Sequence, residues 1–185
     1  MTASEKSRTR RVEIFRSEGT PLSEDVMSSE GVDESVMAGF GKLLAAGGGT
    51  VEVERTQCLF RSPEDNGFSL VHAWFKSNFV LPRHSHNTDC LYYVVGGELR
   101  MGTTVLRKGD GFFVPGGKGY TYEAGPDGVE ILEFRDVSHY NILYKGNDDA
   151  HWDRMANAFR ENVPRWADET TPPSDRNLKT PGDNG

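Results

Sequence analysis

Two histidines one residue apart, His84 and His86, are the residues whose types and spacing most directly suggest chemistry. On an extended strand the side chains at i and i+2 point to the same face, so the two imidazoles are expected side by side. Neutral imidazole is the commonest protein ligand for Zn, Fe, Ni and Cu. If this face is the inside of a barrel, the pair predicts a metal site. If the segment is a loop after Pro82, two exposed histidines are the simpler interpretation.

The segments around this pair resemble the two signatures of the cupin superfamily. The first signature is Gly, five residues, His-x-His, three or four residues, Glu, six residues and Gly. The same spacing occurs here at Asn78, His84, His86, Cys90 and Gly97. The second signature is Gly, five residues, Pro, one, Gly, two, His, three and Asn. Its counterpart reads Gly109, Pro115, Gly117, Tyr120 and Ala124.

The resemblance implies an all-β fold, a double-stranded β-helix or RmlC-like cupin jelly-roll barrel with short flanking helices. The sequence pattern from 50 to 144 agrees, because short segments rich in Val, Ile and aromatic residues alternate with Gly, Pro, Asp and Asn. Asn78 is expected to take the positive φ of the signature glycine. Turns are predicted at 64–67, 96–97, 108–110 and 126–128. Strands are predicted near 50–60, 68–76, 79–83, 90–95, 98–101, 104–106, 111–114, 120–123 and 129–135.

The metal-ligand set that the resemblance implies is degenerate in this chain. In cupins the signature Glu and the second-signature His complete a site of three His and one Glu, whereas Cys90 and Tyr120 stand at those positions here. One interpretation is that the Cys90 thiolate joins His84 and His86 as a ligand. Tyr120 would then serve as a weak fourth ligand or as an acid or base.

Two further interpretations stay open. Asp89 or His72 could join the histidine pair in a facial triad with open positions. Alternatively, metal binding has been lost, Cys90 is a small buried residue, and tyrosines line a ligand pocket. The cofactor expected under the first two is a divalent transition metal, Fe(II) first, with Zn, Mn, Ni or Cu as alternatives. The third leaves the protein free of metal.

Aromatic and basic side chains near the signatures are candidates for contacts with a substrate. Tyr92 and Tyr120 are candidate catalytic residues, because a phenol can stabilise a developing oxyanion or pass a proton. The predicted substrate pocket consists of Trp74, Tyr122 and Lys118.

A metal-dependent enzyme acting on a small organic molecule is the function we expect, and specifically a non-haem dioxygenase, hence an oxidoreductase. The alternatives are a small-molecule binding or sensing cupin without turnover, and a metal-dependent isomerase or lyase. The cupin fold does not choose among these classes, because function depends on the site. A homodimer is expected by analogy with the family, through sheet faces or an exchanged strand at 51–60.

The chain divides into one predicted barrel and its extensions. Residues 1–32 form an N-terminal arm, expected to be disordered at 1–11. Residues 33–49 form a short helix capped by Asp33 or Ser35 and a Gly-rich link, and 50–144 form the barrel. Residues 145–166 carry a helix capped by Asp148 or Asp149 and ended at Pro164, and 167–185 are expected to be a disordered tail.

Composition excludes several classes of protein. The chain has 185 residues with a formal net charge of -7, and its first eleven residues form a basic arm with Lys6, Arg8, Arg10 and Arg11. The folded middle is strongly acidic and would repel a nucleic acid, and the arm is expected to be a solvated tail. No continuous apolar stretch reaches the roughly 18 to 20 residues of a membrane helix. With two cysteines and no apolar leader, we expect a cytoplasmic protein with free thiols that contacts neither nucleic acid nor membrane.

Overall fold

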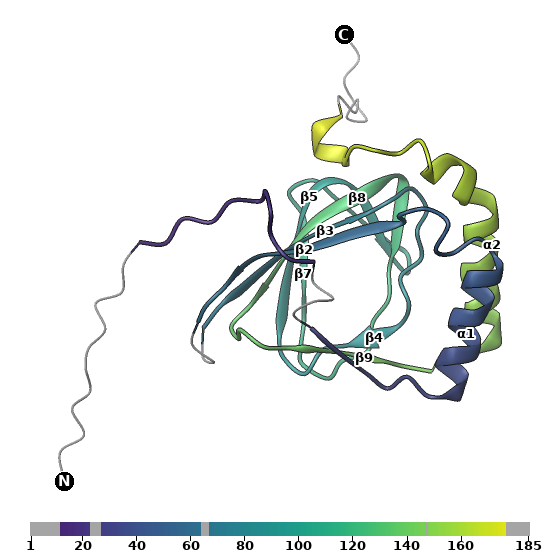
Figure 1. Ribbon diagram of the computed structural model, residues 1–185, viewed down its shortest axis with the longest axis horizontal. Coiled ribbons are helices and arrows are strands. Elements are labelled where there is room, and N and C mark those ends of the chain that lie inside the picture. Colours follow the sequence, from purple (N-terminus) through teal and green to yellow (C-terminus); the bar gives the residue numbers. More distant parts are fainter. Residues whose placement is uncertain (1–11, 23–26, 64–66, 147, 177–185) are drawn as a thin grey trace.

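The computed structural model describes residues 12–22, 27–63, 67–146 and 148–176. Two packed β-sheets form a barrel, and two helices lie together along one side of it (Figure 1). The strands are β1 (Ser28–Glu30), β2 (Glu54–Arg61), β3 (Ser69–Phe75), β4 (His84–Ser85), β5 (Cys90–Met101), β6 (Thr104–Arg107), β7 (Gly111–Val114), β8 (Glu123–Arg135) and β9 (Asn141–Tyr144). The helices are α1 (Glu34–Ala45), α2 (Asp149–Trp166) and the short 3-10 helix η2 (Pro173–Asp175).

The larger sheet has the strand order β2-β3-β8-β5-β6, with β7 paired to β5. The smaller sheet has the order β1-β9-β4, in which β1 runs parallel to β9. The other pairings between the described strands are antiparallel. Several of them join strands far apart in the sequence, such as β3 with β8. This architecture confirms the prediction of a cupin-type jelly-roll barrel.

Two predicted turns are strand irregularities instead. Residues 90–95 and 98–101 belong to one long strand, β5, whose register shifts on both sides of Gly96 and Gly97. Likewise, β8 continues through the expected turn at Pro126 to Gly128. Gly97 has a φ of +72°, and a Cβ there would lie 2.1 Å from the Gly128 carbonyl oxygen. Glycine is therefore needed where the two long strands cross closely and bend, which lets one strand serve both ends of the barrel.

Asn78 occupies the position of the first signature glycine. Its φ is +55°, the only positive φ of a non-glycine residue in the described ranges, as expected from the signature. Its amide nitrogen donates to Asn162 Oδ1 at 3.0 Å. Asn78 thus supplies the left-handed turn and joins the barrel to α2.

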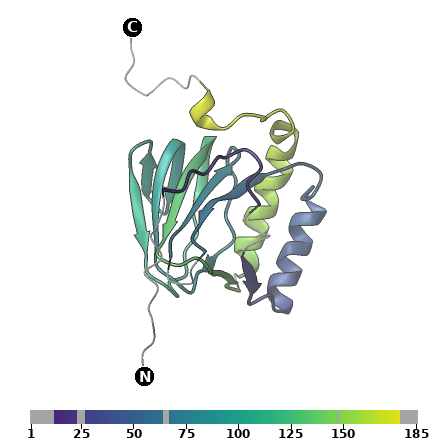
Figure 2. The same ribbon diagram turned by 60° about the vertical axis from the view of Figure 1, so that its left-hand side comes forward.

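The two helices pack against each other and against the barrel (Figure 2). Asp33 caps α1 and Asp148 caps α2, each by accepting a backbone N–H from the first turn. α2 buries the predicted stripe of Trp152, Met155, Ala156 and Phe159. The helix was expected to end at Pro164 but continues to Trp166. Pro164 lies in its last turn, and the fully buried Trp166 side chain holds that turn against the core. Gly39 lets α1 approach α2, since a Cβ there would lie 2.1 Å from the Trp152 ring.

The segment after α2 packs on the barrel at 167–176, where a disordered tail was expected. The Glu169 carboxylate accepts from the Ser77 backbone N–H at 3.0 Å, and Lys76 Nζ donates to the Trp166 carbonyl at 2.6 Å. Buried polar contacts of this kind are not visible in a local composition rich in Ser, Thr and Pro. The remainder of the predicted tail, 177–185, and the predicted disordered arm, 1–11, lie outside the described residues.

Within the described residues, no helix has both the length and the apolar character that crossing a membrane requires.

Candidate functional site

The two histidines lie in the barrel lumen with their rings side by side. His84 is 4% exposed and His86 is 7% exposed, and their ring centroids are 5.0 Å apart. His84 belongs to β4, which pairs with β9, and its backbone also forms a bridge with Tyr120. This bridge brings the second signature segment against the first. The predicted pair on one face is therefore formed, and the loop interpretation does not hold.

Backbone carbonyls fix the tautomer of both imidazoles. His84 Nδ1 lies 2.8 Å from the Pro82 oxygen, and His86 Nδ1 lies 2.5 Å from the Asn141 oxygen. A carbonyl only accepts, so each Nδ1 carries the hydrogen and each Nε2 is a bare acceptor. Burial lowers the pKa of both rings to about 4. The nearby His86 ring lowers the pKa of His84 further, and the nearby Arg135 lowers that of His86. Both histidines are therefore neutral at pH 7.

The Tyr120 hydroxyl lies between the two bare nitrogens. It is 2.8 Å from His84 Nε2 and 3.3 Å from His86 Nε2, and it also contacts the Tyr92 hydroxyl. Because Tyr120 has one hydrogen, it donates to the closer His84 and accepts from Tyr92. Burial raises the pKa of both phenols well above 10. The second cause is the proximity of Tyr120 in the case of Tyr92, and the proximity of Glu133 in the case of Tyr120. The two candidate catalytic tyrosines thus form a neutral hydrogen-bonded chain that ends on His84.

An ion pair from β8 completes the cluster. Arg135 Nη2 donates to Glu133 Oε2 at 2.6 Å and lies 3.3 Å from His86 Nε2, which accepts its second hydrogen. The guanidinium also lies over the Tyr140 ring, 4.1 Å from Cζ to the centroid. Sequence reasoning did not select Glu133 or Arg135. The signal was present, because both share the strand face of the buried Val129 and Ile131, where charged side chains are rare.

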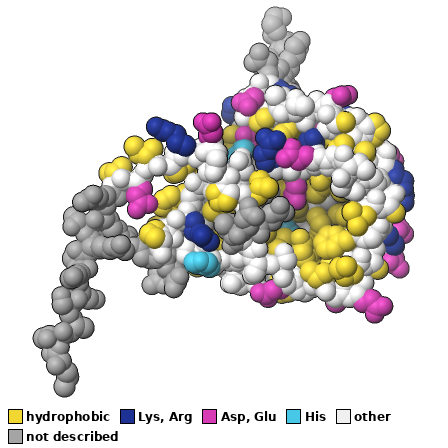
Figure 3. Space-filling view, viewed as in Figure 1, with side chains coloured by type: hydrophobic (Ala, Val, Ile, Leu, Met, Phe, Trp, Pro, Cys, Tyr) yellow, Lys and Arg dark blue, Asp and Glu magenta, His cyan; other side chains and the backbone are white. Residues whose placement is uncertain are grey.

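These groups border a cavity of about 530 Å³ between the barrel and the helices. Hydrophobic side chains gather around this hollow, with histidine surface at its edge (Figure 3). One polar side of the cavity is lined by His84, His86, Tyr120, Tyr122, Glu133, Arg135 and Tyr140, and polar side chains of Ser29, Glu52, Glu54, Arg55 and Thr56 also border it. The apolar side is lined by Phe40, Leu43, Val53, Phe75, Phe79, Leu81 and Phe159. Its volume falls within the roughly 300–1,000 Å³ typical of small-molecule sites.

The other predicted site residues lie in four different places. Tyr122 lines the cavity as predicted, and Cys90 points inward but is packed in the core. Burial raises the pKa of the Cys90 thiol to about 12, so without a metal beside it the group is a neutral thiol at pH 7. Asp89 is exposed and accepts from the Gly116 N–H, and Lys118 is exposed on its loop. The structure does not bring either of these two to the histidines.

His72 and Trp74 lie on the opposite, outer face of the large sheet. They stand opposite Leu132 and Glu130 across β3 and β8, and directly opposed residues share a face. His72 Nε2 contacts Glu130 Oε1 at 2.6 Å, and Trp74 is buried under Arg55 and Lys76. Neither side chain reaches the lumen. Strand parity left the side of His72 undecided, and only the register with β8 resolves it.

The side chains of the cluster do not fit a resident divalent metal as they lie. The two Nε2 atoms do converge on one point, but Tyr120 donates there and a guanidinium faces the His86 lone pair. The Glu133 carboxylate is engaged by Arg135. Across the part of the chain that the structure describes, three or more His, Cys, Asp or Glu side chains nowhere gather as a metal site would need.

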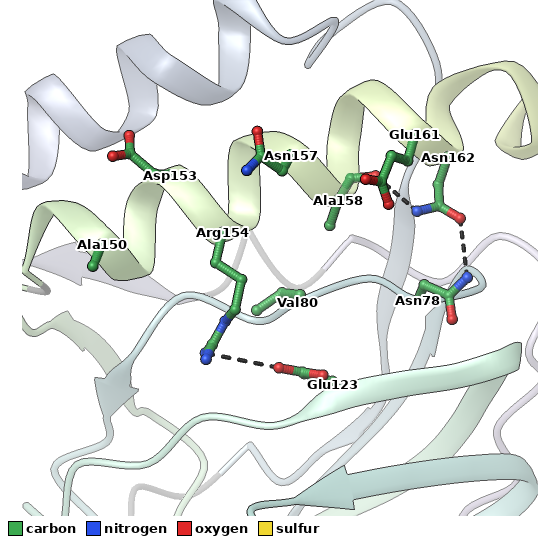
Figure 4. Close-up of a pocket in the computed structure, with 10 residues that line it drawn as sticks. All are labelled: Asn78, Val80, Glu123, Ala150, Asp153, Arg154, Asn157, Ala158, Glu161 and Asn162. Carbon is green, nitrogen blue, oxygen red and sulfur yellow. Dashed lines mark hydrogen bonds and ion pairs between the residues drawn. The ribbon is translucent and has the colours of Figure 1, made fainter.

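A second and more open hollow lies between α2 and the start of β8 (Figure 4). Its volume is about 790 Å³, larger than that of the lumen cavity. Its polar side chains pair with one another: Arg154 with Glu123 at 3.7 Å and Asn78 with Asn162 at 3.0 Å. None of the lumen cluster borders it. We therefore place the functional site in the lumen.

Similarities to this chain occur among solved structures. No protein-family model and no curated protein matches the sequence. Among solved structures, the chain is similar to KdgF from Halomonas sp. at 24% identity, over 45% of this chain and 79% of that one, with a TM-score of 0.40. It is similar to the polyketide cyclase RemF from Streptomyces resistomycificus at 16% identity, over 61% and 85%, with a TM-score of 0.47. An RmlC-like cupin from Shewanella frigidimarina matches at 25% identity, over 48% and 85%, with a TM-score of 0.39.

The barrel and its two signature segments define the class of protein. The spacing of both signatures is unbroken, although Asn78, Cys90, Tyr120 and Ala124 replace signature residues, and the His84–Tyr120 bridge joins the two segments. The chain is a cupin-fold protein. At the identities above, the activities of the similar structures are not implied for this chain.

Proposed function

We propose that this protein binds a small organic molecule in the barrel lumen through its own side chains, without a resident metal. The observation that carries the proposal is the Tyr120 hydroxyl between His84 Nε2 and His86 Nε2. That oxygen occupies the point where the imidazoles would share an ion. The cavity beside it combines hydrogen-bonding groups with a large apolar wall, which is the composition of a ligand site.

The protonation states of the cluster support binding over turnover. A general acid or base works best when its pKa lies near the working pH. The imidazoles have pKa values of about 4, and the phenols have pKa values raised well above 10. At pH 7 the cluster therefore offers fixed donors and acceptors to a ligand rather than protons ready to transfer.

A fragment screen by ligand-observed NMR tests this proposal, with a variant that fills the cavity. Thr56 lines the cavity from β2, and Thr104 is exposed on β6, so Thr56→Trp and Thr104→Trp form a matched pair. Fragments should bind the wild type and Thr104→Trp and should not bind Thr56→Trp. Binding that survives Thr56→Trp, or no binding to the wild type, would contradict a lumen site.

A metal-dependent enzyme is the second candidate, as a dioxygenase or as an isomerase or lyase. The convergence of the two Nε2 atoms on one point favours it, although Tyr120 and Arg135 would have to move. Plasma mass spectrometry of the wild type and of His84→Ala/His86→Ala, expressed with Fe, Mn, Ni, Zn and Cu, decides between the two. Stoichiometric metal that disappears in the double variant would replace the first proposal with this one.

A further inference from the structure

Arg135 is held rigidly at the cavity with part of its hydrogen-bonding capacity unused. Its side chain is 1% exposed, and it lines the cavity. Of its five N–H groups, the two on Nη2 meet Glu133 and His86. Its Nε and Nη1 atoms are buried and have no partner. Three N–H groups of a buried cation therefore have no protein partner, and proteins supply such groups with an ordered water or a ligand.

Arg135 is the one residue that brings such a deficit to the cavity. Seven residues in the described ranges have buried side-chain nitrogen or oxygen atoms without a partner, and Arg135 is the one among them that lines the lumen cavity. The other six lie in the strands, in α2 and in the C-terminal segment. The arginine also cannot turn away easily, because Glu133 holds one end and the Tyr140 ring lies against its plane.

We infer that the lumen binds an organic carboxylate, whose oxygens accept from Nη1 and Nε of Arg135. This inference rests on the proposed function and names the ligand class for the same site. A guanidinium presents its donors in the planar geometry that matches a carboxylate, and such charge-assisted hydrogen bonds are short and strong. A carboxylate supplies the acceptors that the three free N–H groups lack.

Glu133 acts in this arrangement as a positioning residue. Its carboxylate engages Nη2, so it orients the guanidinium and leaves Nη1 and Nε for the ligand. The ligand carboxylate would then contact Nη1 and Nε of the guanidinium while Glu133 contacts Nη2, so the two carboxylates would not compete for the same nitrogen. The neighbouring imidazoles and phenols are uncharged at pH 7, so the repulsion against an anion comes from Glu133 and from Glu52 and Glu54, which also border the cavity. Arg55, which is paired with Glu52, borders the cavity beside them.

The rest of the ligand must be apolar and is expected to be flat or aromatic. Away from the polar cluster the cavity is bounded by rings, with Phe75 and Phe79 stacked at 5.4 Å and Tyr122 edge-on to Phe75 at 5.7 Å. Tyr122 also lies 6.3 Å from Tyr120, so the aromatic wall is continuous with the hydrogen-bonded cluster. A carboxylate on an aromatic or aliphatic body matches both ends of the cavity.

Matched pairs of acids and amides test the inference by isothermal titration calorimetry. The probes are 3-phenylpropanoate against 3-phenylpropanamide, and hexanoate against hexanamide, each with the wild type. Glu133→Gln/Arg135→Met removes the ion pair without leaving an unpaired charge. The control His72→Gln/Glu130→Gln removes the equivalent pair from the outer face. Unfolding in urea checks that each variant is folded, and Arg135→Lys serves as a second variant.

The wild type and the control should bind each acid at least about tenfold more tightly than its amide, as expected for a charge-assisted contact. Glu133→Gln/Arg135→Met should bind acid and amide equally, and Arg135→Lys should show a reduced preference. Equal binding of acid and amide by the wild type, or a preference that survives the loss of Arg135, would overturn the inference. Fragments that bind without any acid preference refute only the carboxylate, whereas no binding at all refutes the proposed function.

Discussion

The two faces of the large sheet differ in the side chains that they carry around the histidine cluster. On the inner face, β5 and β8 carry Tyr92 and the ion pair Glu133–Arg135, all nearly inaccessible to solvent, beside buried apolar residues such as Val129 and Ile131. On the outer face, β5, β7 and β8 carry large apolar side chains that remain exposed: Leu91, Tyr93, Phe113 and Phe134, which are 52%, 45%, 56% and 42% exposed. A sheet that only needed a core would not bury charged side chains on one face while it exposes aromatic ones on the other.

The buried polar side chains of the inner face support the proposed ligand site in the lumen. Burying hydrogen-bonding and charged groups costs free energy unless each is paired, and here the pairing is nearly complete except at Arg135. The outer face contains one polar pair, His72–Glu130, whose carboxylate also accepts from the Ser174 N–H under the C-terminal segment. That pair is satisfied by the protein alone, whereas the inner pair is not.

The largest expected difference between the faces is the cost of breaking each ion pair. Arg135→Met leaves the Glu133 carboxylate buried and unpaired, so it should lower the free energy of unfolding by about 3–5 kcal/mol. Glu133→Gln/Arg135→Met should recover much of this loss. On the outer face, His72→Gln should cost about 1 kcal/mol, because Ser174 still donates to Glu130. Urea unfolding measures all three, and equal losses for Arg135→Met and His72→Gln would contradict the contrast.

The pH dependence of stability should come from the inner histidines. Their pKa is about 4 in the folded protein and near 6.5 in the unfolded chain, so below pH 6.5 the unfolded state binds more protons. The free energy of unfolding is therefore fully retained above pH 6.5 and falls as the pH drops towards 4, by roughly 3 kcal/mol per ring at most. Urea unfolding at pH 7 and pH 5 measures the loss.

His84→Gln/His86→Gln provides the test of that origin. This variant should lose most of the pH dependence between 6.5 and 4, while His139→Gln, a change at an exposed position, should keep it. An undiminished pH dependence in the double variant would assign it to other groups.

Removing the central hydroxyl should have a smaller effect. Tyr120→Phe leaves His84 Nε2 and the Tyr92 hydroxyl without their shared partner, which should cost about 1–3 kcal/mol. Tyr93→Phe, on the outer face of the same region, should change stability by less than about 0.5 kcal/mol. Thermal or urea unfolding compares the two, and a similar effect for both would mean that the hydroxyl chain does not stabilise the lumen.

Substitutions on the outer apolar face should have the smallest effect on stability, and their main effect should be on the oligomeric state. The homodimer expected from the family stays a prediction, and this face is where we expect a second copy to pack. Leu91→Ser/Phe113→Ser should change the free energy of unfolding of the monomer by less than about 1 kcal/mol, because both side chains are more than half exposed. Light scattering after size-exclusion chromatography should show a dimer for the wild type and a monomer for the variant. A monomeric wild type would contradict the predicted homodimer.

The sequence alone determined those features that depend on local spacing. Strand alternation placed His84 and His86 on one face, side-chain caps started both helices, and the signature spacing indicated the barrel and the left-handed turn at Asn78. The histidine pair and the caps follow from residues within a few positions of one another, because backbone geometry fixes where neighbouring side chains point. The barrel and the turn at Asn78 follow from the resemblance of two longer segments, 78–97 and 109–124, to the cupin signatures.

Only the tertiary structure decided what faces the histidines. The Tyr120 hydroxyl comes from the second signature, Arg135 comes from β8, and Phe40 and Phe159 come from the two helices. Their proximity depends on the register of strands distant in sequence and on helix packing, and a shift of one residue would turn Arg135 outward and Phe134 inward. The local sequence pattern indicates which side chains share a face of one strand, but the register between strands decides which of them meet in the lumen.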